Sequence, residues 1–216
     1  EEITTRFPDV LFESCSGGGG RYDAGMLYYM PQTWTSDNTD PIARLKIQYS
    51  TSLVYPISTM GAHVSAIPNH QTGRETSLDI RGNVAMSGVL GYELDLTTLS
   101  EEEKVLIVKQ VDFYKEHRQL LQFGDFVRLK SPYEENEVAW MFVSKDKKEA
   151  IVFYFRVLVE ASAPYVTLKL AHLDETLEYQ IANHVISGDA LMNIGMYIDP
   201  KLHGDYATQS FILKAK

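Results

Sequence analysis

The order of apolar and polar residues divides the chain into two parts with different patterns. Up to about residue 122, short apolar runs alternate with stretches of helical periodicity, which is typical of β–α units. From residue 123 onward the pattern changes to short β-rich runs, separated by turn sequences such as KDKK and SGD. We therefore predict an α/β domain over residues 1–122 and an antiparallel β-sandwich domain over residues 123–216.

Four strands and two helices are predicted in the first part. The strands span residues 9–16, 27–34, 55–65 and 83–94. A helix over 41–54 has Asp40 as its expected N-cap and Pro41 in its first turn. A longer helix over 100–121 opens with a capping box of Ser100 and Glu103, and carries apolar residues at 105, 108 and 111.

The strand count leaves two fold classes open for the first part. Four parallel strands cannot close a (β/α)8 barrel, which needs eight strands and roughly 250 residues. The first part is therefore either an open α/β sheet or the second half of such a barrel. In a barrel, catalytic groups gather at the carboxyl ends of strands, and polar residues follow three of the predicted strands here.

Composition and charge exclude several classes of partner. The 20 basic and 29 acidic residues leave a net charge of −9, which argues against a nucleic-acid partner. No apolar run approaches the ~18 residues of a membrane span, so no membrane partner is expected. The lone Cys15 cannot form an internal disulfide, which suits a reducing, cytoplasmic compartment. The six histidines lack metal-ligand spacing, and neither a metal nor a cofactor is expected.

The stretch PQTWTSDNTD, residues 31–40, holds the densest group of polar side chains. One interpretation is that Asp37 and its neighbours only form turns and cap the following helix, which suits Asp40 well. Trp34 fits that interpretation poorly, because a tryptophan at a polar strand end often forms a platform against a ligand such as a sugar. Asp37 is therefore a candidate acid–base carboxylate, with capping as the alternative.

The first predicted strand ends in CSGGGG, residues 15–20. Glycines let the backbone approach a ligand closely, although a run of them also forms a flexible turn. No GK[ST] sequence follows, so this is not a phosphate-binding loop. Cys15 is either a small apolar residue or a nucleophile, and the chain shows no Cys–His arrangement that would activate it.

Long consecutive stretches carry a resemblance to a known family. They are FESCSGGGGRYDAGMLYYMPQTWTSDNTD at 12–40, the segments 44–74 and 84–104, and SGDALMNIGMYIDPKLHGDYATQSFILK at 187–214. Together they closely resemble α-galactosidases of glycoside hydrolase family 36, the bacterial type that acts on raffinose and melibiose. The resemblance covers essentially the whole chain.

The resemblance implies a fold and an activity. Family members have an N-terminal β-supersandwich, a central (β/α)8 barrel and a C-terminal β-sandwich. Residues 1–122 would be the last four β–α units of the barrel, and residues 123–216 the C-terminal domain. The family hydrolyses terminal α-galactosyl residues with retention of configuration and without a cofactor. Relatives are often tetramers, so a homo-oligomer is expected.

The resemblance also implies roles for individual residues. Asp37, in the WTSD motif, would be the acid/base carboxylate, and Trp34 of the same motif would line the galactose subsite. The CSGG motif maps the same subsite onto Cys15, Gly17 and Gly18.

The nucleophile of the family is not found in this chain. It belongs to a Lys-Trp-Asp motif, whereas the two tryptophans here, Trp34 and Trp140, are followed by Thr35 and Met141. The chain also begins at Glu1 rather than at a methionine. We therefore expect a fragment of a longer enzyme, inactive by itself.

Two other functions remain open. The chain could be a non-catalytic carbohydrate-binding or assembly module, in which Trp34 and the glycine loop bind sugar; the missing nucleophile favours this alternative. A different α/β enzyme with Cys15 as its nucleophile is the third reading.

Overall fold

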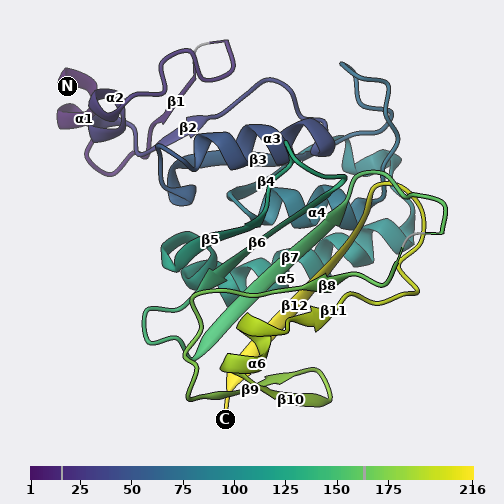
Figure 1. Ribbon diagram of the computed structural model, residues 1–216. Coiled ribbons are helices and arrows are strands. Elements are labelled where there is room, and N and C mark those ends of the chain that lie inside the picture. The colour runs from purple at the N-terminus through teal and green to yellow at the C-terminus, as the bar shows by residue number, and fades with distance from the viewer. Residues whose placement is uncertain (16, 163) are drawn as a thin grey trace. The chain divides into compact units, whose positions relative to one another are not determined.

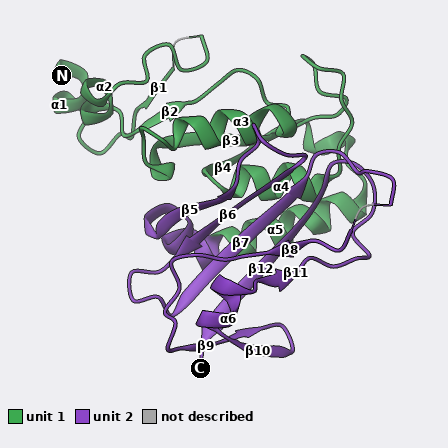
Figure 2. Ribbon diagram, viewed as in Figure 1, with its two compact units in different colours: residues 1–114 green, residues 115–216 purple. Residues whose placement is uncertain are grey.

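The structure is a computed structural model that describes residues 1–15, 17–162 and 164–216. It consists of two compact units, unit 1 over Glu1–Tyr114 and unit 2 over Lys115–Lys216 (Figure 2). The division lies inside the longest helix, α5 (Glu101–Phe123), so each unit includes part of that helix. The predicted domain boundary after residue 122 falls at the C-terminal end of the same helix.

Unit 1 is built on a four-stranded parallel sheet whose spatial order, β1-β2-β3-β4, is also the chain order (Figure 1). The strands are β1 (Glu13–Ser14), β2 (Gln32–Trp34), β3 (Met60–Ser65) and β4 (Val89–Glu93). The helical segments are α1 (Glu2–Arg6), α2 (Ala24–Tyr29), α3 (Pro41–Thr51), η1 (Ile57–Thr59), α4 (Leu78–Met86) and η2 (Leu96–Thr98). Because the strands are parallel, their carboxyl ends meet at one edge of the sheet.

Several helices of unit 1 begin at a residue whose side chain caps them. The carboxylate of Asp40 accepts a hydrogen bond from the Ala43 amide at 2.9 Å, as predicted for the N-cap of α3. The capping box of α5 is also confirmed. The Ser100 amide donates to Glu103 at 3.0 Å, and the Glu103 amide donates to the Ser100 hydroxyl at 3.2 Å.

Two predicted strands are wrong over part of their length. The predicted strand 27–34 begins inside helix α2, whose N-cap Asp23 accepts from the Met26 amide, and only the residues of β2 form a strand. The predicted strand 83–94 begins inside α4, which Ser77 caps, and β4 starts at Val89. The caps precede apolar runs that read as strands, so local capping outweighs strand propensity there. The predicted strand 55–65 shortens to β3, and the described part of the predicted strand 9–16 shortens to β1; position 16 lies outside the described residues.

Of the three apolar residues noted for the predicted helix, Val105 and Val108 lie on an exposed side of α5, whereas Val111 is half-buried. Val105 and Val108 are 55% and 58% exposed. Leu106 and Ile107 instead pack against the apolar cluster on β3 and α4, and Gln110 donates to the Leu78 carbonyl at 3.0 Å. Residues 105–108 are all apolar, so the sequence pattern is compatible with more than one helix face.

Unit 2 contains a six-stranded antiparallel sheet of order β10-β9-β12-β7-β6-β5, and a two-stranded sheet of β8 and β11. The large sheet comprises β5 (Asp125–Lys130), β6 (Glu137–Val143), β7 (Glu149–Arg156), β9 (Glu178–Ile181), β10 (His184–Ser187) and β12 (Ala207–Ala215). The small sheet comprises β8 (Thr167–Leu168) and β11 (Met196–Tyr197), and a short helix, α6 (Gly188–Asn193), follows β10. The predicted antiparallel, β-rich part is thus confirmed.

The central strands of unit 2 are buried on both faces. Alternate residues of β6 and β7, such as Met141 and Val152, pack in a core with residues of β8, β11 and α6. The residues between them form an aromatic row on the opposite face, in which Trp140 and Phe155 have ring centroids 4.9 Å apart. All four of these side chains are at most 1% exposed. Burial of both faces explains the continuous apolar runs in the sequence.

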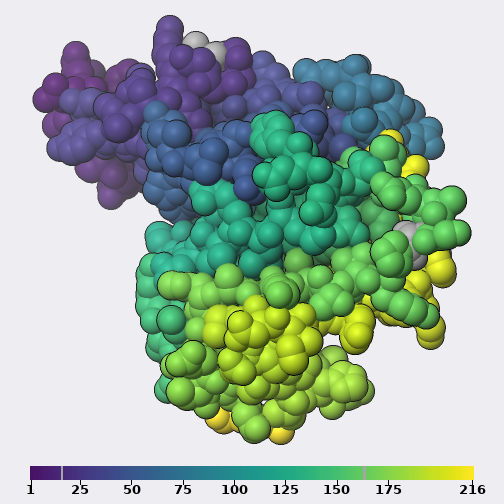
Figure 3. Space-filling model, viewed as in Figure 1, coloured from purple at the N-terminus to yellow at the C-terminus, as the bar shows by residue number. Residues whose placement is uncertain are grey.

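The N-terminal segment of unit 1 exposes large apolar side chains. Ile3, Phe7, Val10 and Leu11 are between 49% and 74% exposed. Figure 3 shows this segment in purple at one end of unit 1. Within the described ranges, no helix combines the length and apolarity needed to cross a membrane.

Candidate active site at the carboxyl edge of the parallel sheet

The carboxyl ends of β1 and β2 place three predicted residues along one edge of the sheet. Ser14 pairs with Thr33 in the parallel register, so Cys15 and Trp34 are the next residues on neighbouring strands. Asp37 follows in the loop that leads into α3. Cys15 and Asp37 are both exposed, as a substrate-contacting position requires.

The Asp37 carboxylate is held by the indole of Trp34. The Trp34 Nε1–H donates to Asp37 Oδ1 at 3.0 Å. The indole lies against the His63 ring, with centroids 4.5 Å apart. Gly61 of β3 leaves room for it, because a Cβ there would stand 3.1 Å from Trp34 Cε3. The direction of the carboxylate is therefore set by a half-buried ring packed on the neighbouring strand.

A buried arginine ties this loop to α3. The guanidinium of Arg44 donates to three main-chain carbonyl oxygens: Nη2 to Ser36 at 2.6 Å, Nε to Asn38 at 2.8 Å and Nη1 to Gly61 at 3.1 Å. Its Cζ also lies 4.5 Å from the ring centroid of Trp34, which is a cation–π contact.

The electrostatic environment of Arg44 reflects its burial. The side chain is 2% exposed, and desolvation lowers the pKa of Arg44 to about 10. The carboxylates of Glu93 and Asp37 oppose that shift by favouring the charged form. Arg44 is still a cation at neutral pH, and its charge faces the site.

The glycine loop lies against the backbone that carries Asp37. A Cβ on Gly18 would stand 2.7 Å from the Asp37 amide nitrogen and 3.2 Å from its Cγ. A Cβ on Gly19 would stand 2.6 Å from the Thr35 carbonyl oxygen. Gly17 has no heavy atom within 4 Å of its Cβ position, although its φ of +57° is also left-handed. Close approach to the Asp37 loop thus requires glycine at 18 and 19.

Asp40 has a structural role distinct from that of Asp37. Asp40 is fully buried, caps α3 and forms an ion pair with Arg74. Within the loop, the Asn38 side chain accepts from the Asp40 amide at 3.1 Å, and the Ser36 hydroxyl accepts from the Asn38 amide at 3.1 Å. The capping interpretation therefore holds for Asp40, while the exposed Asp37 carboxylate is available for chemistry.

Sequence reasoning missed Arg44 and His63 at this site. In the sequence, Arg44 is an ordinary residue of the helix predicted over 41–54. The buried residues of α3 include Arg44, Leu45 and Gln48, which share one face of the helix. Because the hydrogen-bond acceptors of Arg44 are main-chain carbonyl oxygens, the sequence carries no signal for this contact.

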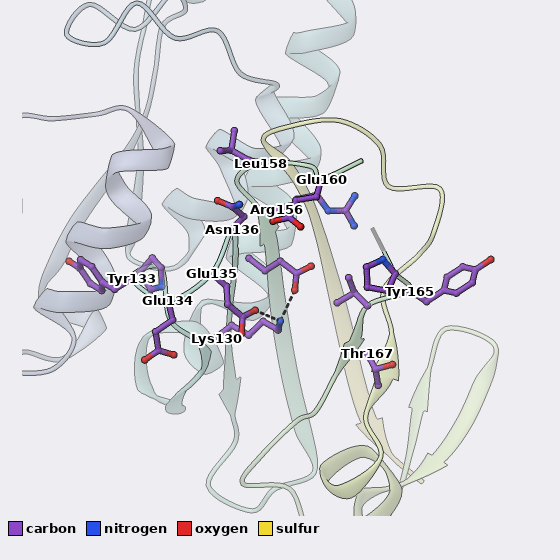
Figure 4. A pocket seen from close by; sticks show the side chains of 14 residues that line it. Lys130, Tyr133, Glu134, Glu135, Asn136, Arg156, Leu158, Glu160, Tyr165 and Thr167 are labelled. Carbon is purple, nitrogen blue, oxygen red and sulfur yellow. Dashed lines mark hydrogen bonds and ion pairs between the residues drawn. The ribbon is translucent and has the colours of Figure 1, made fainter. Parts of the chain in front are cut away.

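A hollow lined only by residues of unit 2 has a volume of about 730 Å³. Lys130 lies within it and contacts Glu135 and Glu137 at 2.7 and 2.6 Å (Figure 4). The rings of Tyr133 and Tyr165 point away from it in opposite directions, so they form no stacking platform inside. This hollow lacks the carboxylate–indole arrangement of the Asp37 site.

Two protein-family profiles match the chain. The sequence profile of the melibiase family matches residues 1–124, and the profile of the glycosyl hydrolase family 36 C-terminal domain matches residues 137–213. The chain belongs to glycoside hydrolase family 36. The resemblance stated from the sequence is confirmed.

Relatives in the family are similar along the whole chain. Alpha-galactosidase AgaA of Geobacillus stearothermophilus is 62% identical over 216 residues, which are 100% of this chain and 30% of AgaA. Alpha-galactosidase Mel36A of Lactobacillus acidophilus is 52% identical over 217 residues, 99% of this chain and 29% of Mel36A. An AgaA crystal structure in complex with raffinose superposes with a TM-score of 0.97 at 61% identity, covering 100% of this chain and 30% of that one. The chain therefore spans about 30% of the length of these relatives.

Proposed function

We propose that the chain is the acid/base-bearing part of a retaining α-galactosidase, which removes terminal α-galactosyl residues from raffinose-type oligosaccharides, melibiose and simple galactosides. The observation that carries the proposal is the exposed Asp37 carboxylate at the carboxyl edge of a parallel sheet, oriented by the Trp34 indole. The names of the relatives support it, as do AgaA structures in complex with raffinose and with stachyose.

Retaining glycosidases use two carboxyl groups about 5–5.5 Å apart. One attacks the anomeric carbon, while the other protonates the leaving oxygen and later activates a water molecule. We assign the second role to Asp37. Trp34 binds Oδ1, and we assign proton transfer to Oδ2. The nucleophile would come from a part of the longer protein that lies outside these 216 residues.

The galactose wall is proposed to combine the indole of Trp34 with the segment at Cys15, Gly17 and Gly18. The apolar C–H face of a sugar packs well on an aromatic ring. Gly18 lies against Asp37. Cys15 and Gly17 are exposed, and we assign both of them to the surface that faces the sugar. We expect Cys15 to crowd the 2-position of the sugar, which would favour galactose over an N-acetylated analogue.

We further propose that unit 1 supplies the last four β–α units of a (β/α)8 barrel. Its strands are parallel and follow chain order, as successive barrel strands do. The exposed apolar side chains near the N-terminus would then pack against the remaining units. Three further points remain predictions from the sequence. They are the domain boundary at residue 122, a homo-oligomeric parent such as the family's tetramers, and a cytoplasmic location.

The isolated chain of 216 residues is predicted to have no α-galactosidase activity. A single carboxylate can donate a proton but cannot form the glycosyl-enzyme intermediate. Assay of the purified chain with para-nitrophenyl α-galactoside tests this. Turnover that disappears in the Asp37→Ala variant would contradict the proposal, because the whole reaction would then be contained in the chain.

In the full-length protein, Asp37→Ala should affect raffinose far more than para-nitrophenyl α-galactoside. A good leaving group needs little protonation, so we expect kcat/KM to fall by roughly 100-fold or more on raffinose and by less than about 10-fold on the aryl substrate. Equal losses on the two substrates would argue against the acid assignment. Unchanged activity on both would favour the non-catalytic carbohydrate-binding module instead.

The glycine loop offers a matched pair of variants in the full-length protein. Both Gly17 and Gly18 have a positive φ, but only a Cβ on Gly18 would press on Asp37. Gly18→Ala is therefore expected to lower kcat/KM on raffinose by roughly 10- to 100-fold, through displacement of the carboxylate, and Gly17→Ala by much less. Similar losses for both variants would show that backbone conformation, rather than contact with Asp37, is what matters.

A further inference from the structure

Asp37 is an exposed residue in a loop, yet a general acid must hold its carboxyl group within hydrogen-bond reach of the leaving oxygen. We propose that Arg44 is a positioning residue that fixes the Asp37 carboxylate, acting through the loop backbone and through Trp34. This inference rests on the proposed acid/base role of Asp37. It adds a residue of α3 that touches neither the substrate nor the reacting atoms.

The first line of support is the pattern of backbone contacts. Ser36 and Asn38 are the residues on either side of Asp37, and the carbonyl oxygens of both accept hydrogen bonds from the Arg44 guanidinium, at 2.6 and 2.8 Å. The third guanidinium nitrogen donates to the Gly61 carbonyl of β3 at 3.1 Å. One planar cation therefore joins both flanks of Asp37 to the sheet.

The second line of support is the path through the side chains. The guanidinium lies 4.5 Å from the ring centroid of Trp34, and the N–H of that same ring donates to Asp37 at 3.0 Å. Displacement of Arg44 would thus disturb both the backbone of Asp37 and the hydrogen-bond donor of its carboxylate. The backbone hydrogen bonds and the contact with the indole therefore both act on the position of Asp37.

The third line of support is the geometry that only arginine supplies. The three acceptors lie in different directions around a rigid, planar fork, which the compact ammonium of lysine cannot match. Burial of the cation carries a desolvation cost, which the three carbonyl oxygens and the nearby carboxylates of Glu93 and Asp37 offset. A buried cation of this kind is suited to specifying one conformation of the loop.

Arg81 provides a matched control on the neighbouring helix α4. It is also buried, at 4% exposure, and donates to main-chain carbonyls of Ser65 at 2.7 Å and Ser77 at 3.4 Å. These carbonyls do not flank Asp37. Arg81→Lys therefore removes a buried guanidinium of similar environment and leaves the contacts of the Asp37 loop in place.

The test compares Arg44→Lys and Arg81→Lys in the full-length protein with two aryl α-galactosides. The para-nitrophenyl and para-methoxyphenyl galactosides share the sugar and differ in how much protonation their leaving groups need. For Arg44→Lys we expect kcat/KM to fall by roughly 10- to 100-fold on the methoxyphenyl substrate and by less than about 5-fold on the nitrophenyl substrate. Arg81→Lys should lose activity by the same factor on both substrates, whatever its effect on thermal stability.

Equal losses on the two substrates for Arg44→Lys would overturn the inference, because a merely structural role lowers the amount of active enzyme without any dependence on the leaving group. The same leaving-group dependence in Arg81→Lys would overturn it as well. Asp37→Ala, measured in parallel, separates this result from the proposed function. If Asp37→Ala itself shows no leaving-group dependence, the acid/base role of Asp37 is contradicted, and the inference about Arg44 falls with it.

If Arg44→Lys does not fold, the same two substrates are compared with the Trp34→Phe variant. It keeps an aromatic ring beneath the guanidinium but removes the N–H that holds Asp37. Lost contact with galactose would affect both aryl substrates equally, whereas a misplaced acid affects the methoxyphenyl substrate more. We expect an excess loss of roughly 3- to 10-fold on that substrate. Equal losses on the two substrates would overturn the inference that Arg44 acts through Trp34 on Asp37.

Discussion

The guanidinium of Arg44 stacked on the indole of Trp34 is the contact on which the candidate site depends. It connects α3, the end of β2 and the β3 carbonyl of Gly61 through one buried cation. Without it, the residues on either side of Asp37 would lose their hydrogen bonds to α3. A flexible carboxylate costs entropy each time it must reach the reacting oxygen, and pre-organisation avoids that cost.

The surrounding residues are arranged to permit this contact. Gly61 makes space for the indole on β3, and Gly18 lets a second loop approach the Asp37 backbone from β1. Three neighbouring strands therefore contribute to the position of one side chain. Because parallel strands end at one edge, residues far apart in the sequence meet there without any long connection. This accounts for the clustering of polar residues after the strands.

The sequence predicted the architecture better than the strand boundaries. Alternating apolar runs predicted the parallel sheet, and the β-rich runs after residue 123 predicted the antiparallel sheet of unit 2. The N-cap at Asp40 and the capping box of α5 were correct, because capping acts within four residues. Strand 27–34 was wrong, because Asp23 starts a helix in an apolar run that also suits a strand.

The sequence predicted which residues belong to the candidate site, but it did not predict how they are arranged in space. Asp37, Trp34 and the glycine loop stand out in the sequence because polar and glycine residues at strand ends are unusual. Arg44 does not stand out, because its role comes from carbonyl acceptors of Ser36, Asn38 and Gly61, two of which lie in a loop whose path is set by tertiary packing. Backbone acceptors carry no sequence signal.

The central claim is that Asp37 is the acid/base carboxylate of a site completed by another part of the full-length protein. A crystal structure of that protein with an intact α-galactoside bound tests it most directly. The account predicts that the Asp37 carboxyl lies within about 2.6–3.2 Å of the glycosidic oxygen, and that a second carboxyl from outside this chain stands about 5–5.5 Å from it, at the anomeric carbon. A ligand bound with Asp37 turned away from the glycosidic oxygen, or another acid in that position, would contradict it.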